Sequence, residues 1–290
     1  MKQITLKRWI SYDEGVAFKR SIGGWVNAGE KGMHWLNLIF IFVLFTSVPV
    51  SNFAYADFYQ GARVYQFTPV PVSEFAQTEF DKGLEAYNRK DYKTALKEWQ
   101  NDADEGRVTA QYNLGVMYYG VISYLGQDVR RDYAEAMHWF RLAANQGYAR
   151  AQLNLGNMNY SGTGVPLDYT KAIHWFRLAA NQGLSDAQTN LGGMLEEGLG
   201  VSKNITEAIH WYLLSADQGG VMAQLNLGRI YYTGDAVPQN NITALMWYNL
   251  VATQKSAWVF NVKNNLQEKM TPEQIAEAER LTQEWLAEHQ

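Results

Sequence analysis

The stretch Ala-Ile-His-Trp-Phe at residues 172–176 decides the fold of this sequence, because close copies of it recur. The copies are Ala-Met-His-Trp-Phe at 136–140, Ala-Ile-His-Trp-Tyr at 208–212 and Ala-Leu-Met-Trp-Tyr at 244–248, so the four stretches follow one another at intervals of 36 residues. A fixed period of about 20 to 50 residues is typical of a stacked repeat array. The sequence therefore predicts one supersecondary unit in several copies, and such arrays more often bind than catalyse. The tryptophans of the four copies are Trp139, Trp175, Trp211 and Trp247.

Signals for helix ends recur with the same period. An Asp or Asn precedes each second helix, where its side chain can accept hydrogen bonds from the free amides of the first turn. A glycine follows the same helix, where a left-handed residue ends a helix at little cost. The pattern predicts pairs of helices joined by short turns. The capping residues are Asp91, Asp132, Asp168, Asn204 and Asn240, and the glycines are Gly106, Gly147, Gly183 and Gly219.

The first helix of each unit carries a Leu-Gly pair in its interior, at 114–115, 155–156, 191–192 and 227–228. A glycine inside a helix costs about 1 kcal/mol relative to alanine. Four such glycines at one structural position predict that a neighbouring helix packs directly against each of them. We expect the tryptophans to pack between the helices as the main hydrophobic side chains of each unit.

The combined pattern resembles a known family. Ala-x-x-x-Leu-Gly, then Gly-x-Gly-Val at 162–165 and 198–201, then Ala-x-x-Trp-[Phe/Tyr]-x-x-Ala-Ala-x-Gln-Gly is similar to the Sel1-like repeat, a longer relative of the tetratricopeptide repeat. The resemblance implies four repeats over 107–256 in an all-α fold, an α/α superhelical solenoid whose first helices line the concave side. It also implies an exported bacterial protein that binds other proteins.

The segments on either side of the repeats are predicted to be caps. Residues 73–106 resemble a tetratricopeptide-type unit with a short turn, and 257–290 are expected to form C-terminal capping helices, the last capped by Thr271-Pro272-Glu273. The first repeat carries a five-residue insertion within 121–129. Insertions in arrays map to loops, often on the binding face.

The N-terminus predicts export. Residues 36–48 are almost wholly apolar, Pro49 follows, and Ala54-Tyr55-Ala56 provides a small-x-small site, the pattern of a secretory signal peptide. We expect residues 1–56 to be removed after Ala56, a periplasmic or secreted product, and only transient contact with the membrane. Residues 57–72 are expected to form an extended leader. Two alternatives are a translation start at Met33 and a membrane-tethered form that retains 36–50.

The candidate binding residues follow from the resemblance. In related tetratricopeptide domains the first-helix position two residues before the glycine faces a groove, where asparagine can hold a peptide backbone or a terminal carboxylate. The alternative is that these asparagines only bond a neighbouring helix. Residues one and four after the glycine are expected on the same face. The predicted concave-face set is Asn113, Tyr119, Asn154, Asn157, Tyr160, Asn190, Glu196, Asn226, Arg229 and Tyr232.

The composition argues against several other functions. The formal net charge is −4 and no basic run is present, so we expect no nucleic-acid partner. His138, His174 and His210 recur at the repeat period, but packed helices lie about 8–10 Å apart, too far for two of them to share one zinc ion. We expect no metal, no cofactor and no catalytic residues.

The sequence thus favours an exported scaffold or adaptor that binds a peptide or protein along its concave face, not an enzyme. The alternative is a β-lactam-binding or β-lactam-hydrolysing enzyme, as described for some secreted Sel1-like proteins. Those relatives carry a disulfide in each unit, whereas this chain has no cysteine.

Overall fold

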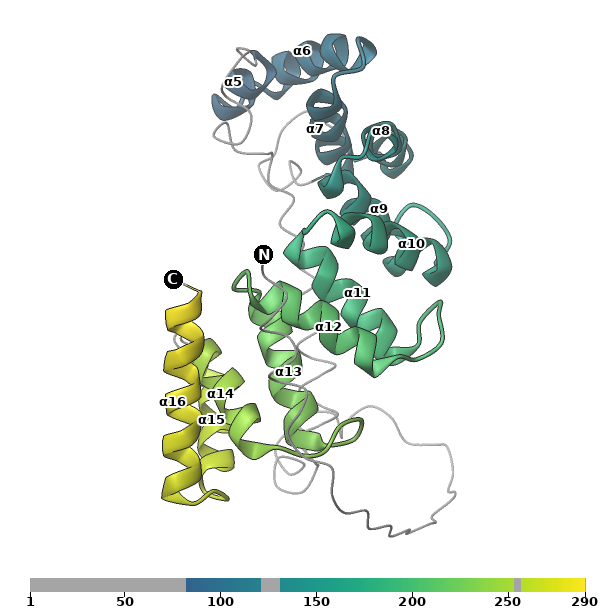
Figure 1. Cartoon of the computed structure of the whole chain (residues 1–290). Helices are drawn as coiled ribbons and strands as arrows, with labels where there is room; N and C mark the ends of the chain where they lie inside the picture. The colour runs from purple at the N-terminus through teal and green to yellow at the C-terminus, as the bar shows by residue number, and fades with distance from the viewer. Residues whose placement is uncertain (1–81, 121–130, 253–256, 290) are drawn as a thin grey trace, which may run out of the picture. The chain divides into compact units, whose positions relative to one another are not determined.

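The structure is a computed structural model that describes residues 82–120, 131–252 and 257–289. All of these residues belong to one unit of the chain, Tyr65–Gln290. The described residues form helices joined by turns, without a β-strand, so the predicted all-α class is confirmed (Figure 1). The helices are α5 (Lys82–Asn88), α6 (Tyr92–Asp104), α7 (Val108–Tyr119), α8 (Tyr133–Asn145), α9 (Ala149–Ser161), α10 (Tyr169–Asn181), α11 (Ser185–Glu197), α12 (Ile205–Ala216), α13 (Val221–Thr233), α14 (Asn241–Ala252), α15 (Ala257–Gln267) and α16 (Pro272–Glu288).

The helices pack in chain order. Each helix from α5 to α15 contacts the helix that follows it or the one before it, and α14 packs against both α15 and α16 (Figure 1). In each repeat the first and second helices form the closest pairs, α7 with α8, α9 with α10, α11 with α12 and α13 with α14. The result is the predicted α/α solenoid.

A glycine notch holds each helix pair together. A Cβ atom on Gly115 would lie 2.5 Å from Cδ1 of Phe140, so only glycine lets the second helix approach this closely. The prediction that a helix packs directly on each of these glycines is confirmed. Gly83 of the N-terminal unit accommodates Trp99 in the same way. The other notch pairs are Gly156 with Phe176, Gly192 with Tyr212 and Gly228 with Tyr248.

The side chain that fills the notch is the aromatic residue after the repeated tryptophan. Phe140 and Phe176 are 0–1% exposed, whereas Trp139 is 7% exposed and Trp175 is only partly buried. The tryptophans do pack between helices as expected, and Trp211 and Trp247 are also buried, at 9% and 2% exposed, but the ring that meets the notch glycine is that of the following residue. The reason is geometric, because the notch faces the residue that follows the tryptophan on the second helix.

The predicted helix caps are confirmed. Asp132 accepts from the backbone amides of Ala134 and Glu135, at 3.0 and 3.1 Å. The other four predicted caps accept from the amide three residues later. At α16 the full reciprocal capping box forms between Thr271 and Gln274. The glycines that end the second helices adopt φ between 80° and 89°, the left-handed region.

Glutamines join the helices at the unit boundaries, a set of contacts that the repeat pattern did not predict. Gln182 Nε2 donates to Gln152 Oε1 at 2.8 Å, and Gln152 Nε2 donates to the Ala144 carbonyl at 3.2 Å. This glutamine relay therefore links the end of α10 through α9 to α8. Equivalent relays run from Gln146 through Gln111 to Ala103 and from Gln218 through Gln188 to Ala180.

Several predictions fall on residues outside those that the structure describes. They are the signal peptide at 1–56, the leader at 57–72, the first part of the capping unit at 73–81 and the insertion within 121–129. Among the described helices, none combines the length and apolarity needed to span a bilayer.

Candidate partner-binding face

The ten predicted binding residues occupy three positions of the first helices. Counted from the notch glycine, these positions are two residues before, one after and four after. Residues three or four apart are neighbours on a helix surface, so the three positions form one row along each helix. We call the surface formed by these rows on α7, α9, α11 and α13 the first-helix face.

The asparagines two residues before the glycine form the floor of this face. Asn113, Asn154 and Asn226 are 4–5% exposed. One side-chain atom of each has no hydrogen-bond partner: Oδ1 of Asn113, and Nδ2 of Asn154 and of Asn226. Three equivalent side chains thus keep an unused donor or acceptor.

The fourth asparagine of this row differs. Asn190 is partly exposed, and its Nδ2 donates to Oδ1 of Asn157 at 3.2 Å. Asn157 is itself buried and lies one residue after the glycine of the preceding first helix, α9. Asn190 therefore bonds a neighbouring helix, which is the alternative reading of the asparagine row, while the other three asparagines do not show such a bond.

An ion pair links the next two first helices. Glu196 of α11 accepts hydrogen bonds from Arg229 of α13 and, at 3.0 Å, from the hydroxyl of Tyr212. Both charged side chains are largely buried, 11% exposed for Glu196 and 24% for Arg229. The Asn157–Asn190 contact joins α9 to α11 and the Glu196–Arg229 contact joins α11 to α13, so the predicted residues of these three helices lie side by side.

The tyrosines four residues after the glycine are half-buried against their own repeat. Tyr119 packs on Tyr133 with ring centroids 5.3 Å apart, and Tyr160 packs on Tyr169 at 5.5 Å. Burial raises the pKa of Tyr119 above its ordinary value, opposed by a hydrogen bond with Thr163. These rings form the rim of the face beside the buried asparagines.

Tyr232, the equivalent residue of the last repeat, contacts a residue that sequence reasoning missed. Lys269 Nζ donates to the Tyr232 hydroxyl at 3.2 Å and lies 5.6 Å from the ring centroid. Lys269 follows α15 and belongs to no repeat, so the 36-residue period carried no signal for it. Its charge extends the polar face beyond the fourth repeat.

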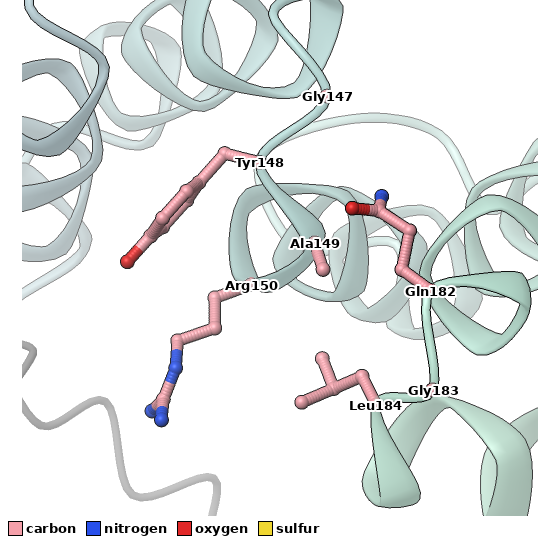
Figure 2. Close-up of a pocket in the computed structure, with 7 residues that line it drawn as sticks. All are labelled: Gly147, Tyr148, Ala149, Arg150, Gln182, Gly183 and Leu184. Atoms are coloured by element: carbon pink, nitrogen blue, oxygen red, sulfur yellow. The ribbon is translucent and has the colours of Figure 1, made fainter. Parts of the chain in front are cut away.

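An open hollow of about 390 Å³ lies where two of the first helices begin. Figure 2 shows Tyr148 and Arg150, from the start of α9, on one side and, on the other, Gln182, which follows α10, and Leu184, which precedes α11. Arg150 is four residues before Asn154 and so neighbours it on the helix surface. The hollow combines apolar, amide and cationic groups next to the asparagine row, a mixture suited to a peptide side chain.

The repeated histidines lie elsewhere. His138, His174 and His210 are exposed on the second helices, and each ring meets the edge or face of the following tryptophan at 5.0–5.4 Å. Over the described ranges no three His, Cys, Asp or Glu side chains come together in a metal-binding group.

The helix-pair repeats described above agree with a match to a known protein family. A family model described as the Sel1 repeat matches residues 108–148, 149–184, 185–220 and 221–256, just over half of the chain. Each matched range holds one helix pair with its glycine notch. The chain belongs to the Sel1 repeat family. Sel1 repeat proteins generally mediate protein–protein interactions, and generally act as scaffolds rather than enzymes.

Solved Sel1-type structures agree. A protective antigen of uropathogenic Escherichia coli with an SLR fold is 33% identical, over 68% of this chain and 42% of that one, with a TM-score of 0.62. A Sel1 repeat protein from Oxalobacter formigenes is 30% identical, over 63% of this chain and 73% of that one, with a TM-score of 0.57. The chain thus spans less than half the length of the antigen. A comparison with curated proteins produced no match.

Proposed function

We propose that this Sel1 repeat protein is an exported adaptor that binds an extended segment of a partner protein along its first-helix face. Family membership supports binding to proteins in general. The contacts between successive first helices support this particular surface, because they join its rows on α9, α11 and α13.

The unpartnered amide atoms of Asn113, Asn154 and Asn226 carry the proposal. A buried polar atom without a hydrogen bond costs about 1–3 kcal/mol, so a row of three calls for an explanation. A peptide backbone explains it, because a carboxamide offers both a donor and an acceptor and every peptide unit needs both. A single asparagine of the row, Asn190, uses its amide within the described protein.

The burial of the asparagines determines how a partner reaches them. Asn113, Asn154 and Asn226 are only 4–5% exposed, so their amides are less accessible than the half-buried rim tyrosines Tyr119 and Tyr160. An extended segment that pairs with the amides displaces rim side chains as it enters. The rest of the surface is already formed by packed helices, so little ordering of the protein opposes binding.

Two asparagine variants test this site. The full chain would be crosslinked in envelope extracts, and each captured partner purified for direct titration. We expect Asn154→Leu and Asn226→Leu to weaken binding about tenfold each, the effect of one or two lost hydrogen bonds. Asn181→Leu on the exposed end of α10 is the matched control and is expected to bind like the wild type. Equal affinity of all three variants would show that the partner does not bind at the first-helix face, whereas the assignment of the fold would be unaffected.

Export is the second part of the proposal, and it is supported by the apolar stretch at 36–48 and the Ala54-Tyr55-Ala56 site. We expect the mature protein to begin at Asp57 and to be periplasmic or secreted. N-terminal sequencing and intact-mass measurement of the cellular protein test this. A mass that includes residues 36–50 would instead indicate the tethered form.

Binding rather than catalysis is the third part. The chain carries no cysteine, unlike the disulfide-rich Sel1-like proteins associated with β-lactams, and its net charge of −4 does not favour nucleic acid. We expect no turnover of nitrocefin by the purified chain. Nitrocefin turnover at a rate proportional to the concentration of the purified protein would instead support the enzymatic alternative.

A further inference from the structure

The C-terminal end of the first-helix face carries a lysine that has no carboxylate partner in the described ranges of the chain. Lys269 is exposed, and its Nζ donates to the hydroxyl of Tyr232 at 3.2 Å. Within the part of the chain that the structure describes, Lys269 forms no ion pair, although Glu268 is its neighbour in sequence. Among the residues that the structure describes, therefore, no carboxylate neutralises the positive charge of Lys269 beside the face.

At the preceding junction, between α11 and α13, a carboxylate pairs with the cation. There, the residue four after the notch glycine is Glu196, and it pairs with the cation of the next helix pair, Arg229. At the last junction the equivalent residue is Tyr232, and the cation that reaches it is Lys269. A neutral hydroxyl thus stands where the previous repeat has a carboxylate. The hydroxyl accepts from Lys269, which leaves its own proton available for an acceptor.

A second unused donor lies on the same helix. Asn226 of α13 is 5% exposed, and its Nδ2 has no hydrogen-bond partner. Asn226 precedes Tyr232 by six residues, which is about 9 Å along a helix axis. An extended chain rises about 3.3 Å per residue, so groups roughly three residues apart match this separation.

We propose that Lys269, Tyr232 and Asn226 form a subsite that binds a carboxylate of the partner segment. This inference rests on the proposed peptide-binding function of the same face. The Lys269 ammonium and the Tyr232 hydroxyl donate to the two carboxylate oxygens, and Asn226 Nδ2 donates to a main-chain carbonyl about three residues away. Charge-assisted hydrogen bonds of this kind are the strong ones.

The carboxylate has two sources, a C-terminus or an Asp or Glu side chain. Three pools of fluorescein-labelled decapeptides, randomised over Ala, Ser, Asn, Leu and Tyr, distinguish them. The first pool has a free C-terminus, the second is amidated, and the third is amidated but carries one Glu. We expect the full chain to bind one carboxylate pool about tenfold more tightly than the neutral pool in fluorescence anisotropy, the effect of one charge-assisted hydrogen bond.

Variants assign the preference to this subsite. Lys269→Gln is expected to abolish the preference, so that the carboxylate pool binds no more tightly than the neutral pool, and Tyr232→Phe to reduce it severalfold. Lys203→Gln, which removes an exposed lysine from the turn before α12, is the charge-matched control and should keep the preference. We also expect the preference to fall in 1 M salt, because exposed charges are then screened.

The outcomes separate the two proposals. Equal affinity of the wild type for all pools overturns the subsite and leaves peptide binding in place. A preference that persists in Lys269→Gln also overturns it, because the charge would then be recognised elsewhere. Failure of the wild type to bind any pool overturns the proposed function itself, and the subsite with it.

Discussion

Phe176 occupies the space that Gly156 leaves open on the facing helix, where an added Cβ would lie 2.5 Å from Cδ1 of the ring. The same contact recurs in all four repeats and sets how closely each helix pair approaches. Because the ring is 1% exposed and surrounded by packed side chains, it has little room to move away.

Gly156→Ala is therefore expected to destabilise the protein by about 2–3 kcal/mol, the cost of overpacking, although alanine favours helices by about 1 kcal/mol. Urea unfolding monitored by circular dichroism measures the change. Phe176→Leu creates room, so the Gly156→Ala cost should shrink in the double variant. Additive costs in this cycle would show that the notch does not limit the packing.

Gln152→Ala breaks the glutamine relay between α10, α9 and α8. The substitution removes the hydrogen bonds from Gln152 to the Ala144 carbonyl and from the exposed Gln182 to Gln152. The Ala144 carbonyl still accepts from the Gly147 amide at 2.9 Å, so the cost is that of the lost hydrogen bonds, about 0.5–1.5 kcal/mol. We expect a loss of that size in the free energy of unfolding. Gln283→Ala on the exposed side of α16 is the control, with an expected change within about 0.5 kcal/mol.

Substitution by leucine should affect the stability of the protein differently at Asn154 and at Asn190. Asn154→Leu removes an unpartnered buried amide atom, so we expect stability to be unchanged or raised. Asn190→Leu removes the donor to Asn157 Oδ1, so we expect a loss of about 1 kcal/mol. Chemical denaturation of both variants makes the comparison. A similar loss in both would indicate that the asparagine row is only structural.

The Glu196–Arg229 pair should show strong coupling, because both side chains are largely buried. Removing one partner leaves the other charge buried and unpaired, which lowers the free energy of unfolding by about 3–5 kcal/mol, whereas removing both partners lowers it less. A double-mutant cycle with Glu196→Ala and Arg229→Ala measures this. The exposed Arg177–Glu207 pair, with N–O distance 2.9 Å, is the matched comparison and should couple by at most about 1 kcal/mol.

Stability should fall at alkaline pH. Burial raises the pKa of Tyr248 well above that of an ordinary tyrosine, opposed by the nearby charge of Arg229. The folded state therefore keeps the proton where the unfolded state, with a pKa of about 10, releases it, so stability is retained below pH 10 and lost above it. Tyr248→Phe should flatten this loss in unfolding measurements between pH 9 and about 11. An unchanged slope would argue against a raised pKa.

The helix pairs could be predicted from the sequence because backbone geometry dictates the residue types that mark them. Gly156 tolerates the close ring, Asp168 caps α10 and Gly183 takes a positive φ. These requirements are local, so they recur with the period. It was harder to predict which aromatic ring fills the notch, because this depends on how the second helix is rotated about its own axis.

The side-chain contacts between units could not be predicted in the same way. Gln152 and Gln182 are 30 residues apart, and only the rotamers within the packed array bring them together. Lys269 lies outside the periodic region altogether. Which amides of the asparagine row stay unpaired also depends on the neighbouring residue, since Asn190 finds Asn157 across the junction.

The glutamine relay has a consequence for how such proteins change length. Because the same three hydrogen-bonding groups recur at successive boundaries, excision of one 36-residue block would bring together two ends that already match each other. Duplication of a block would do the same. The number of blocks can therefore vary over evolution while every unit boundary keeps its hydrogen bonds. The length of the binding surface then changes in steps of one block.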